Sequence, residues 1–95
     1  ELLEKVTFLS RHLASNAKLD LVPPQSGLFA FLDISGSGLT SDEFAYNLLL
    51  EKNVALTPGI SFGRNWDNHV RISLAAHKDE FEEGVALVDQ FTKEL

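Results

Sequence analysis

The sequence predicts a single α+β domain in which helices pack on a small sheet. Two segments carry apolar residues at helical spacing, a third begins with helix-start signals, and three short apolar segments are typical of strands. The expected order is helix, strand, helix, strand, strand, helix. A helix joins the first two strands, so they should run parallel, whereas a loop makes the second and third antiparallel. We therefore expect a small mixed three-stranded sheet packed with helices, forming one domain over residues 1–95.

Residues 1–15 should form the first helix, because apolar residues recur at intervals of four, three and four. Leu3 widens this stripe, which consists of Leu2, Val6, Leu9 and Leu13. Asn16 is a suitable terminating residue. In the segment 19–27, two consecutive prolines remove two backbone donors and hold the chain extended, and Gly27 permits a turn.

The first strand is expected at residues 28–34, whose sequence LFAFLDI is apolar on both faces and suits a central position in the sheet. After the SGSG loop, Thr40 and Glu43 have the spacing of a capping box. Leu39 and Phe44 can form the accompanying hydrophobic staple. The second helix should end near Lys52 and Asn53, and its buried face should contain Phe44, Leu48 and Leu49.

The C-terminal half should supply two more strands and the last helix. VALT at 54–57 and VRISLA at 70–75 are the expected strands. Between them lie a turn, PGISFG, and a polar loop, RNWDNH, which holds the only tryptophan, Trp66. The last helix should run from about Lys78 to Leu95, with Gly84 marking close packing. Its predicted buried stripe is Phe81, Val85, Val88, Phe91 and Leu95.

Composition excludes several function classes. The chain has 14 acidic and 8 basic residues, for a net charge of −6, and no basic cluster, so nucleic acid and anionic lipid are poor candidate partners. The absence of cysteine excludes disulfides, thiolate zinc sites and a cysteine nucleophile. No apolar run is long enough to span a membrane and no signal peptide is visible, so we expect a cytoplasmic protein. The missing initiating methionine leads us to expect a piece of a longer chain.

Most polar residues that could carry chemistry have a structural explanation. The acidic run at 79–83 lies in the first turns of the last helix, where carboxylates interact favourably with the helix dipole, so no metal site is expected. GISFG is out of register with a G-x-S-x-G elbow, and Gly36 and Gly38 lack the rest of a phosphate loop. The histidines lack metal-ligand spacing and are expected at the surface or near caps: His12, His69 and His77.

Arg71 is the exception, because it is a charged residue in the middle of an apolar strand. The pattern leaves two explanations open. The guanidinium can form a salt bridge within the domain, for example with Asp33, or extend to solvent. Alternatively, its planar fork can bind an external carboxylate bidentately and keep its charge when desolvated. Trp66 also has two possible placements, in contact with a partner or folded back over the sheet.

The motifs, taken together and in order, resemble a known family. They are PPQSGLFAFLD, a helix ending in LLLEKNVALTPGISFG, a polar loop, VRISLA, and a final helix containing EEGV. This arrangement is similar to the C-terminal small domain of class I and II aminotransferases, the fold-type-I enzymes that use pyridoxal phosphate (PLP). The resemblance covers nearly all 95 residues. One departure is the loop RNWDNH, which is often glycine-rich in the family.

The resemblance implies that Arg71 holds the α-carboxylate of the amino-acid substrate, which aligns the Cα–H bond with the cofactor ring. It also implies that Phe31 and its strand neighbours are core. The Schiff-base lysine and the other cofactor-binding residues would lie in the large domain of the same polypeptide, because none of this chain's lysines sits in a matching motif. They are Lys5, Lys18, Lys52, Lys78 and Lys93. This chain would then contribute Arg71 to substrate binding, and no catalytic, cofactor-binding or metal-binding residue.

The implied parent is a homodimeric transferase of amino-acid metabolism, which exchanges an amino group between an amino acid and a 2-oxo acid. Its 95-residue small domain alone would be inactive. The residues themselves leave an alternative open: a free-standing α+β module without catalysis, in which Arg71 binds a small carboxylate ligand or a partner's acidic group. A lysine in a cofactor motif upstream of this chain would favour the aminotransferase.

Overall fold

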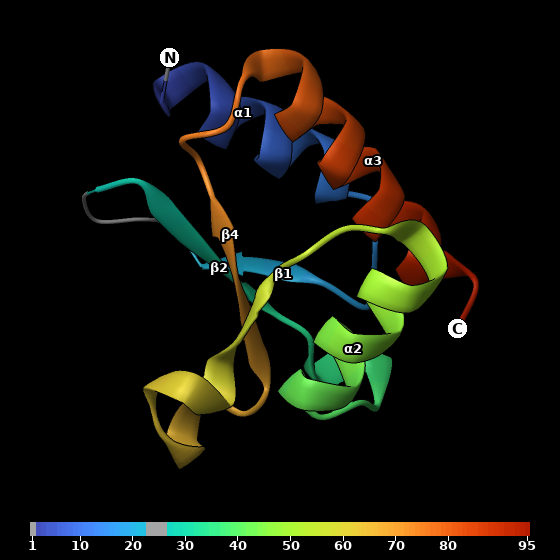
Figure 1. Ribbon diagram of the computed structural model, residues 1–95. Helices are drawn as coiled ribbons and strands as arrows, with labels where there is room; N and C mark the ends of the chain where they lie inside the picture. The colour runs from blue at the N-terminus through green and yellow to red at the C-terminus, as the bar shows by residue number, and fades with distance from the viewer. Residues whose placement is uncertain (1, 23–26) are drawn as a thin grey trace.

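Figure 1 shows the fold in a computed structural model, which describes residues 2–22 and 27–95. Within these residues three α-helices pack against a four-stranded sheet, and the predicted α+β class is confirmed. The helices are α1 (Leu2–Leu13), α2 (Ser41–Lys52) and α3 (Lys78–Lys93). The strands are β1 (Asp20–Val22), β2 (Phe29–Asp33), β3 (Thr57–Pro58) and β4 (His69–Ser73). Three short 3-10 helices lie in the connections: η1 (Ser35–Ser37), η2 (Gly59–Phe62) and η3 (Arg64–Trp66).

The helix-end signals in the sequence correspond to real caps. The hydroxyl of Thr40 accepts a hydrogen bond from the N–H of Glu43 (3.3 Å), and the Glu43 carboxylate accepts one from the N–H of Thr40 (2.9 Å). This completes the predicted capping box at the start of α2. Asn53 ends the helix in the left-handed conformation, with φ of 58°, which asparagine adopts more readily than most residues.

The predicted mixed, three-stranded sheet is wrong in two respects. The strand order is β1-β2-β4-β3, and each neighbouring pair is antiparallel. The two strands joined by α2 do run in the same direction, but β4 lies between them and pairs with both. The sequence does not predict β1, because it has only three residues; it extends the sheet by pairing Leu21 with Leu32. The strand expected at 54–57 is Thr57–Pro58.

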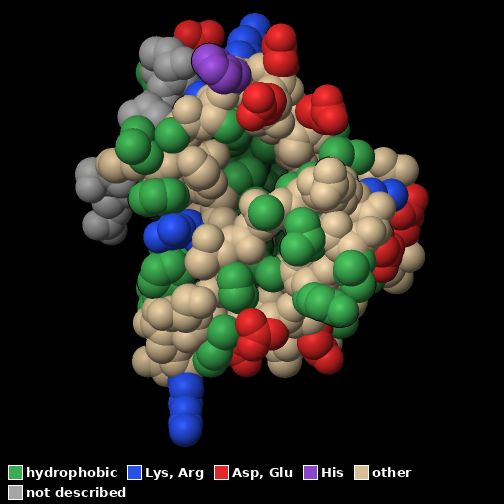
Figure 2. Space-filling view, viewed as in Figure 1, with side chains coloured by type: hydrophobic (Ala, Val, Ile, Leu, Met, Phe, Trp, Pro, Cys, Tyr) green, Lys and Arg blue, Asp and Glu red, His purple; other side chains and the backbone are tan. Residues whose placement is uncertain are grey.

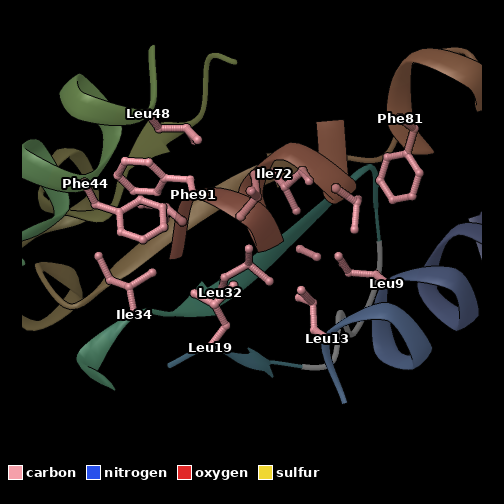
Figure 3. Packing of buried hydrophobic residues seen from close by; sticks show 14 of the residues in the cluster. Leu9, Leu13, Leu19, Leu32, Ile34, Phe44, Leu48, Ile72, Phe81 and Phe91 are labelled. Carbon is pink, nitrogen blue, oxygen red and sulfur yellow. The ribbon is translucent and has the colours of Figure 1, made fainter. Parts of the chain in front are cut away.

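The hydrophobic core lies between the sheet and the helices (Figure 3). Alternate residues of a strand face the same side, so Ala30 and Leu32 of β2 and Val70 and Ile72 of β4 are buried together. The helix stripes contribute most of the remaining buried residues: Leu9, Leu13, Phe44, Leu48, Phe81, Val85, Val88 and Phe91. One face of the sheet is thereby covered by helices.

Some predicted core positions are wrong. Leu3, Leu49 and Leu95 are exposed, with exposed fractions of 72%, 46% and 47%. Gly84 does not mark close packing, since a Cβ built there meets no atom within 4 Å. The side chain of Leu2 and residues 23–26, which include the two consecutive prolines, lie outside the described residues. Over the described ranges, none of the helices has the length and apolar character needed to cross a membrane.

Candidate functional site

Arg71 lies on the side of the sheet that points away from the helices. In β4 it is flanked by the buried Val70 and Ile72, and its Cα partners are Phe31 in β2 and Thr57 in β3. Because side chains alternate along a strand, Arg71 shares this side with the other non-core residues of β2 and β4. We call this side the outer face; it consists of Phe29, Phe31, Asp33, Phe62, Trp66, His69, Arg71 and Ser73.

The guanidinium of Arg71 lies against aromatic rings and has no carboxylate partner among the described residues. Its Cζ is 3.9 Å from the ring centroid of Phe29 and 4.9 Å from that of Phe62. Both distances are within the range of cation–π attraction. The ion pairs in the described ranges join His12, Lys52 and Lys93 to Asp89 or Glu94. Arg71 is half-buried as a residue, and its guanidinium donors are not paired with a carboxylate in the described ranges.

Further aromatic rings cover the outer face beside Arg71. The ring centroid of Phe31 is 4.7 Å from that of Trp66 and 5.6 Å from that of Phe62, and Trp66 is 4.8 Å from His69. Trp66 therefore folds back over the sheet, which is one of its two expected placements. The expectation that Phe31 is core is wrong, because its register opposite Arg71 turns it away from the helices and leaves it half-buried.

Phe29 and Phe62 are not singled out by the sequence. The alternation of Phe29, Ala30 and Phe31 is the one local signal that places two rings on one side of a strand. Phe62 lies in a segment that the sequence identifies only as a turn, so nothing local indicates its contact with Arg71.

The possible salt bridge between Asp33 and Arg71 is not formed. The Cα partner of Asp33 is His69, and its carboxylate accepts hydrogen bonds from the N–H (2.9 Å) and hydroxyl (2.6 Å) of Ser35. Partial burial alone would raise the pKa of Asp33, but the Ser35 hydrogen bonds and the nearby His69 outweigh it, so the pKa is lowered. Asp33 is thus occupied at the end of β2, and Arg71 has no carboxylate counter-ion among the described residues.

Substituting Asp33 by asparagine should reduce the acid sensitivity of the fold. A carboxyl whose pKa is lower in the folded state stabilises the protein above its unfolded pKa of about 3.9. This stabilisation is lost as the pH falls through the lower, folded pKa. The free energy of unfolding of the 95-residue chain can be measured with urea at about pH 7 and at about pH 3. Between these two pH values it should fall less for Asp33→Asn than for the wild type. Equal losses in the two proteins would contradict this role.

Gly59 allows the polar loop 64–69 to lie close to η2. A Cβ at this position would overlap the backbone carbonyl oxygens of Trp66 and His69. Backbone atoms cannot move aside as the end of a flexible side chain can. The loop that carries Trp66 can therefore take this position only with a residue at 59 that has no Cβ.

Gly59→Ala should destabilise the fold by about 1–3 kcal/mol, as overpacking does in other cores. It should also change the near-ultraviolet circular dichroism of Trp66, since the loop must move. Gly84→Ala is the matched control, because its Cβ meets nothing within 4 Å and alanine favours a helix by about 1 kcal/mol. The account fails if the two substitutions shift stability in the same direction.

In the part of the chain that the structure describes, the other polar residues considered from the sequence do not come together as a site. Within the described ranges, no group of three or more histidine, aspartate or glutamate residues could hold a metal ion. His12 lies 3.7 Å from Asp89, and His77 is the N-cap residue of α3. Figure 2 shows acidic side chains gathered near the top of the view, where α3 begins in Figure 1. GISFG forms the 3-10 helix η2 and not a nucleophile elbow.

Most of the chain matches a known protein family. The family model described as aminotransferase class I and II matches residues 1–86. The chain belongs to this family. An aspartate aminotransferase from Pyrococcus abyssi is 36% identical to this aminotransferase chain over 76 residues, which are 80% of this chain and 20% of that protein.

Solved aminotransferase structures share the fold. An aromatic aminotransferase from Pyrococcus horikoshii superimposes with a TM-score of 0.90 at 31% identity, over 99% of this chain and 25% of that one. A PLP-bound protein from Clostridium difficile 630, assigned as an aminotransferase, has a TM-score of 0.87 at 27% identity, over 96% of this chain and 24% of that one. The aminotransferase chain thus spans about one fifth of the length of the curated relatives it matches.

The outer face of this aminotransferase chain offers no amine to PLP. All five lysines lie elsewhere. Lys5 donates to the carbonyl oxygens of Leu74 and Ala76, and Lys18 donates to those of Thr92 and Leu95. Lys52 and Lys93 form ion pairs, and Lys78 is the first residue of α3. The described residues therefore do not fit a covalent PLP site.

Proposed function

We propose that residues 1–95 are the C-terminal small domain of a PLP-dependent aminotransferase, and that Arg71 binds the α-carboxylate of its substrates. The parent enzyme would transfer an amino group between an amino acid and a 2-oxo acid. PLP, bound by the large domain of the same polypeptide, supplies the electron sink for this transfer. The small domain supplies binding and orientation of the substrate.

The environment of Arg71 is the observation that carries this proposal. An arginine that serves stability alone is expected to pair with a carboxylate or to extend into water. Arg71 instead lies half-buried against two rings, without a carboxylate partner among the described residues. Aromatic rings attract the cation but do not replace the oxygen acceptors that its N–H groups prefer. Those donors match a substrate carboxylate bidentately.

Binding at Arg71 would orient the substrate. A bidentate pair restrains rotation of the carboxylate, so the neighbouring Cα is presented to the cofactor in one direction. Both an amino acid and a 2-oxo acid carry a carboxylate beside the reacting carbon, so one arginine can serve both. The small-domain assignment is supported by the coverage of about one fifth of the relatives, which leaves the cofactor site to other residues of the parent. Homodimer formation and a cytoplasmic location stay predictions for that parent.

An activity assay of the full-length protein tests the proposal. The protein is supplied with PLP and 2-oxoglutarate, and glutamate formation is measured with each standard L-amino acid as donor. We expect turnover with at least one donor, and none from the 95-residue chain alone. If the full-length protein transferred no amino group from any donor, the aminotransferase assignment would be overturned in favour of a module that only binds carboxylates.

A further inference from the structure

Two phenylalanines from different elements lie against the guanidinium of Arg71. Phe29 is the first residue of β2, and its Cα partner is Ser73, two residues along β4 from Arg71. Diagonal neighbours in adjacent strands are about 7–8 Å apart, which long side chains on one face can bridge. Phe62 is the last residue of η2 and supplies the second ring. The centroid distances to Arg71 Cζ are 3.9 Å and 4.9 Å.

A backbone hydrogen bond lies beside Phe29, and a ring contact supports Phe62. The N–H of Leu74 donates to the carbonyl oxygen of Leu28 (2.6 Å), which ties β4 to the residue before Phe29. Phe62 meets Phe31 edge to face, with an interplanar angle of 86°. Phe29 and Phe62 are nevertheless 43% and 42% exposed, so core packing does not explain why these rings stand beside a charge.

We propose that Phe29 and Phe62 are positioning residues for Arg71, which hold its guanidinium in the orientation that receives the substrate carboxylate. This inference rests on the proposed function of Arg71. The rings attract the cation through their π-electrons and leave its N–H groups free for the carboxylate. An arginine held in this way loses less side-chain freedom when substrate binds, which is the advantage of preorganisation.

Leucine substitutions in the full-length enzyme separate this role from simple packing. Phe29→Leu and Phe62→Leu keep an apolar side chain but remove the ring. Each should raise KM for the most active amino-acid donor by up to about tenfold, the scale of a cation–π contact, with a smaller change in kcat. Phe29→Tyr and Phe62→Tyr keep the ring and should restore KM to within about twofold of the wild type. Tyr46→Leu, which removes an exposed ring from α2, is the matched control and should leave KM unchanged.

A double-mutant cycle distinguishes positioning from direct contact with substrate. In the Arg71→Ala background, which has no cation beside the ring, Phe29→Leu should raise KM no further, because the ring acts through the guanidinium. Full additivity would overturn the inference, as would tyrosine variants no better than the leucine variants. Arg71→Lys can raise KM for the donor while both leucine variants keep the wild-type KM. That result would contradict the positioning role of the rings and leave the proposed function of Arg71 supported. An unchanged KM in Arg71→Lys would contradict the proposed function of Arg71, and with it the positioning role of the two rings.

Discussion

Replacing Arg71 by lysine in the full-length aminotransferase should lower kcat/KM for amino-acid substrates by about 100-fold. Lysine keeps the positive charge but not the planar fork, so one charge-assisted hydrogen bond is lost, and such bonds contribute about 1.5–3 kcal/mol. A difference of about 1.4 kcal/mol is tenfold in rate. Arg71→Ala should cost more, because the charge is lost as well. Initial rates with varied amino acid and varied 2-oxo acid should show the defect for both, since both carry the carboxylate.

The PLP absorbance of the resting Arg71→Lys enzyme should equal that of the wild type, because the proposed cofactor site lies outside residues 1–95. Arg64→Lys is a matched control: this arginine is exposed in η3 and lies outside the outer face, so its kinetics should not change. Wild-type kcat/KM for Arg71→Lys would contradict a carboxylate-binding role. A lost PLP spectrum would contradict the division of labour between the domains.

Replacing Phe91 by alanine should lower the free energy of unfolding of the 95-residue chain by about 3–5 kcal/mol, as for other buried phenylalanines. Phe91 is 1% exposed, and its ring meets that of Phe44 edge to face, with centroids 5.2 Å apart (Figure 3). This contact joins α3 to α2 on the helical side of the sheet. Since small domains have only about 5–15 kcal/mol of stability, urea titration followed by far-ultraviolet circular dichroism should show a large shift.

The Phe44→Ala and Phe91→Ala double mutant measures the contact itself. Edge-to-face pairs contribute about 0.5–1.5 kcal/mol beyond their burial. The loss of unfolding free energy in the double mutant should therefore differ from the sum of the losses in the two single mutants. Leu49→Ala is the control on the same helix, because its side chain is 46% exposed and should change stability by no more than about 0.5 kcal/mol. A loss at Leu49 as large as that at Phe91 would contradict the described core.

Local signals predict the features that depend on local chemistry. The capping box at Thr40 follows from two residues three apart, and the stripe through Phe81, Val85, Val88 and Phe91 follows from helical periodicity. The predicted burial of Leu49 is wrong because apolar residues occur all around α2. The spacing of these residues therefore does not indicate which of them are buried. The order of the strands depends on pairing between distant segments, which short strands such as Thr57–Pro58 do not encode.

The same limit applies to the candidate site. Arg71 stands out in the sequence because a charge interrupts an apolar strand. Its aromatic neighbours do not, since Phe29 is brought to it only by the β2–β4 register and Phe62 only by the fold of η2. The placement of Phe31 on the outer face follows from its pairing with Arg71, which local sequence does not encode.

A crystal structure of the full-length enzyme with PLP and a bound 2-oxo acid tests the carboxylate-binding role of Arg71 most directly. The account predicts two nitrogens of Arg71 at about 2.7–2.9 Å from the two oxygens of the α-carboxylate, with Phe29 and Phe62 still against the guanidinium. A carboxylate bound by a different cation, with Arg71 paired to an aspartate or glutamate of the parent, would contradict it.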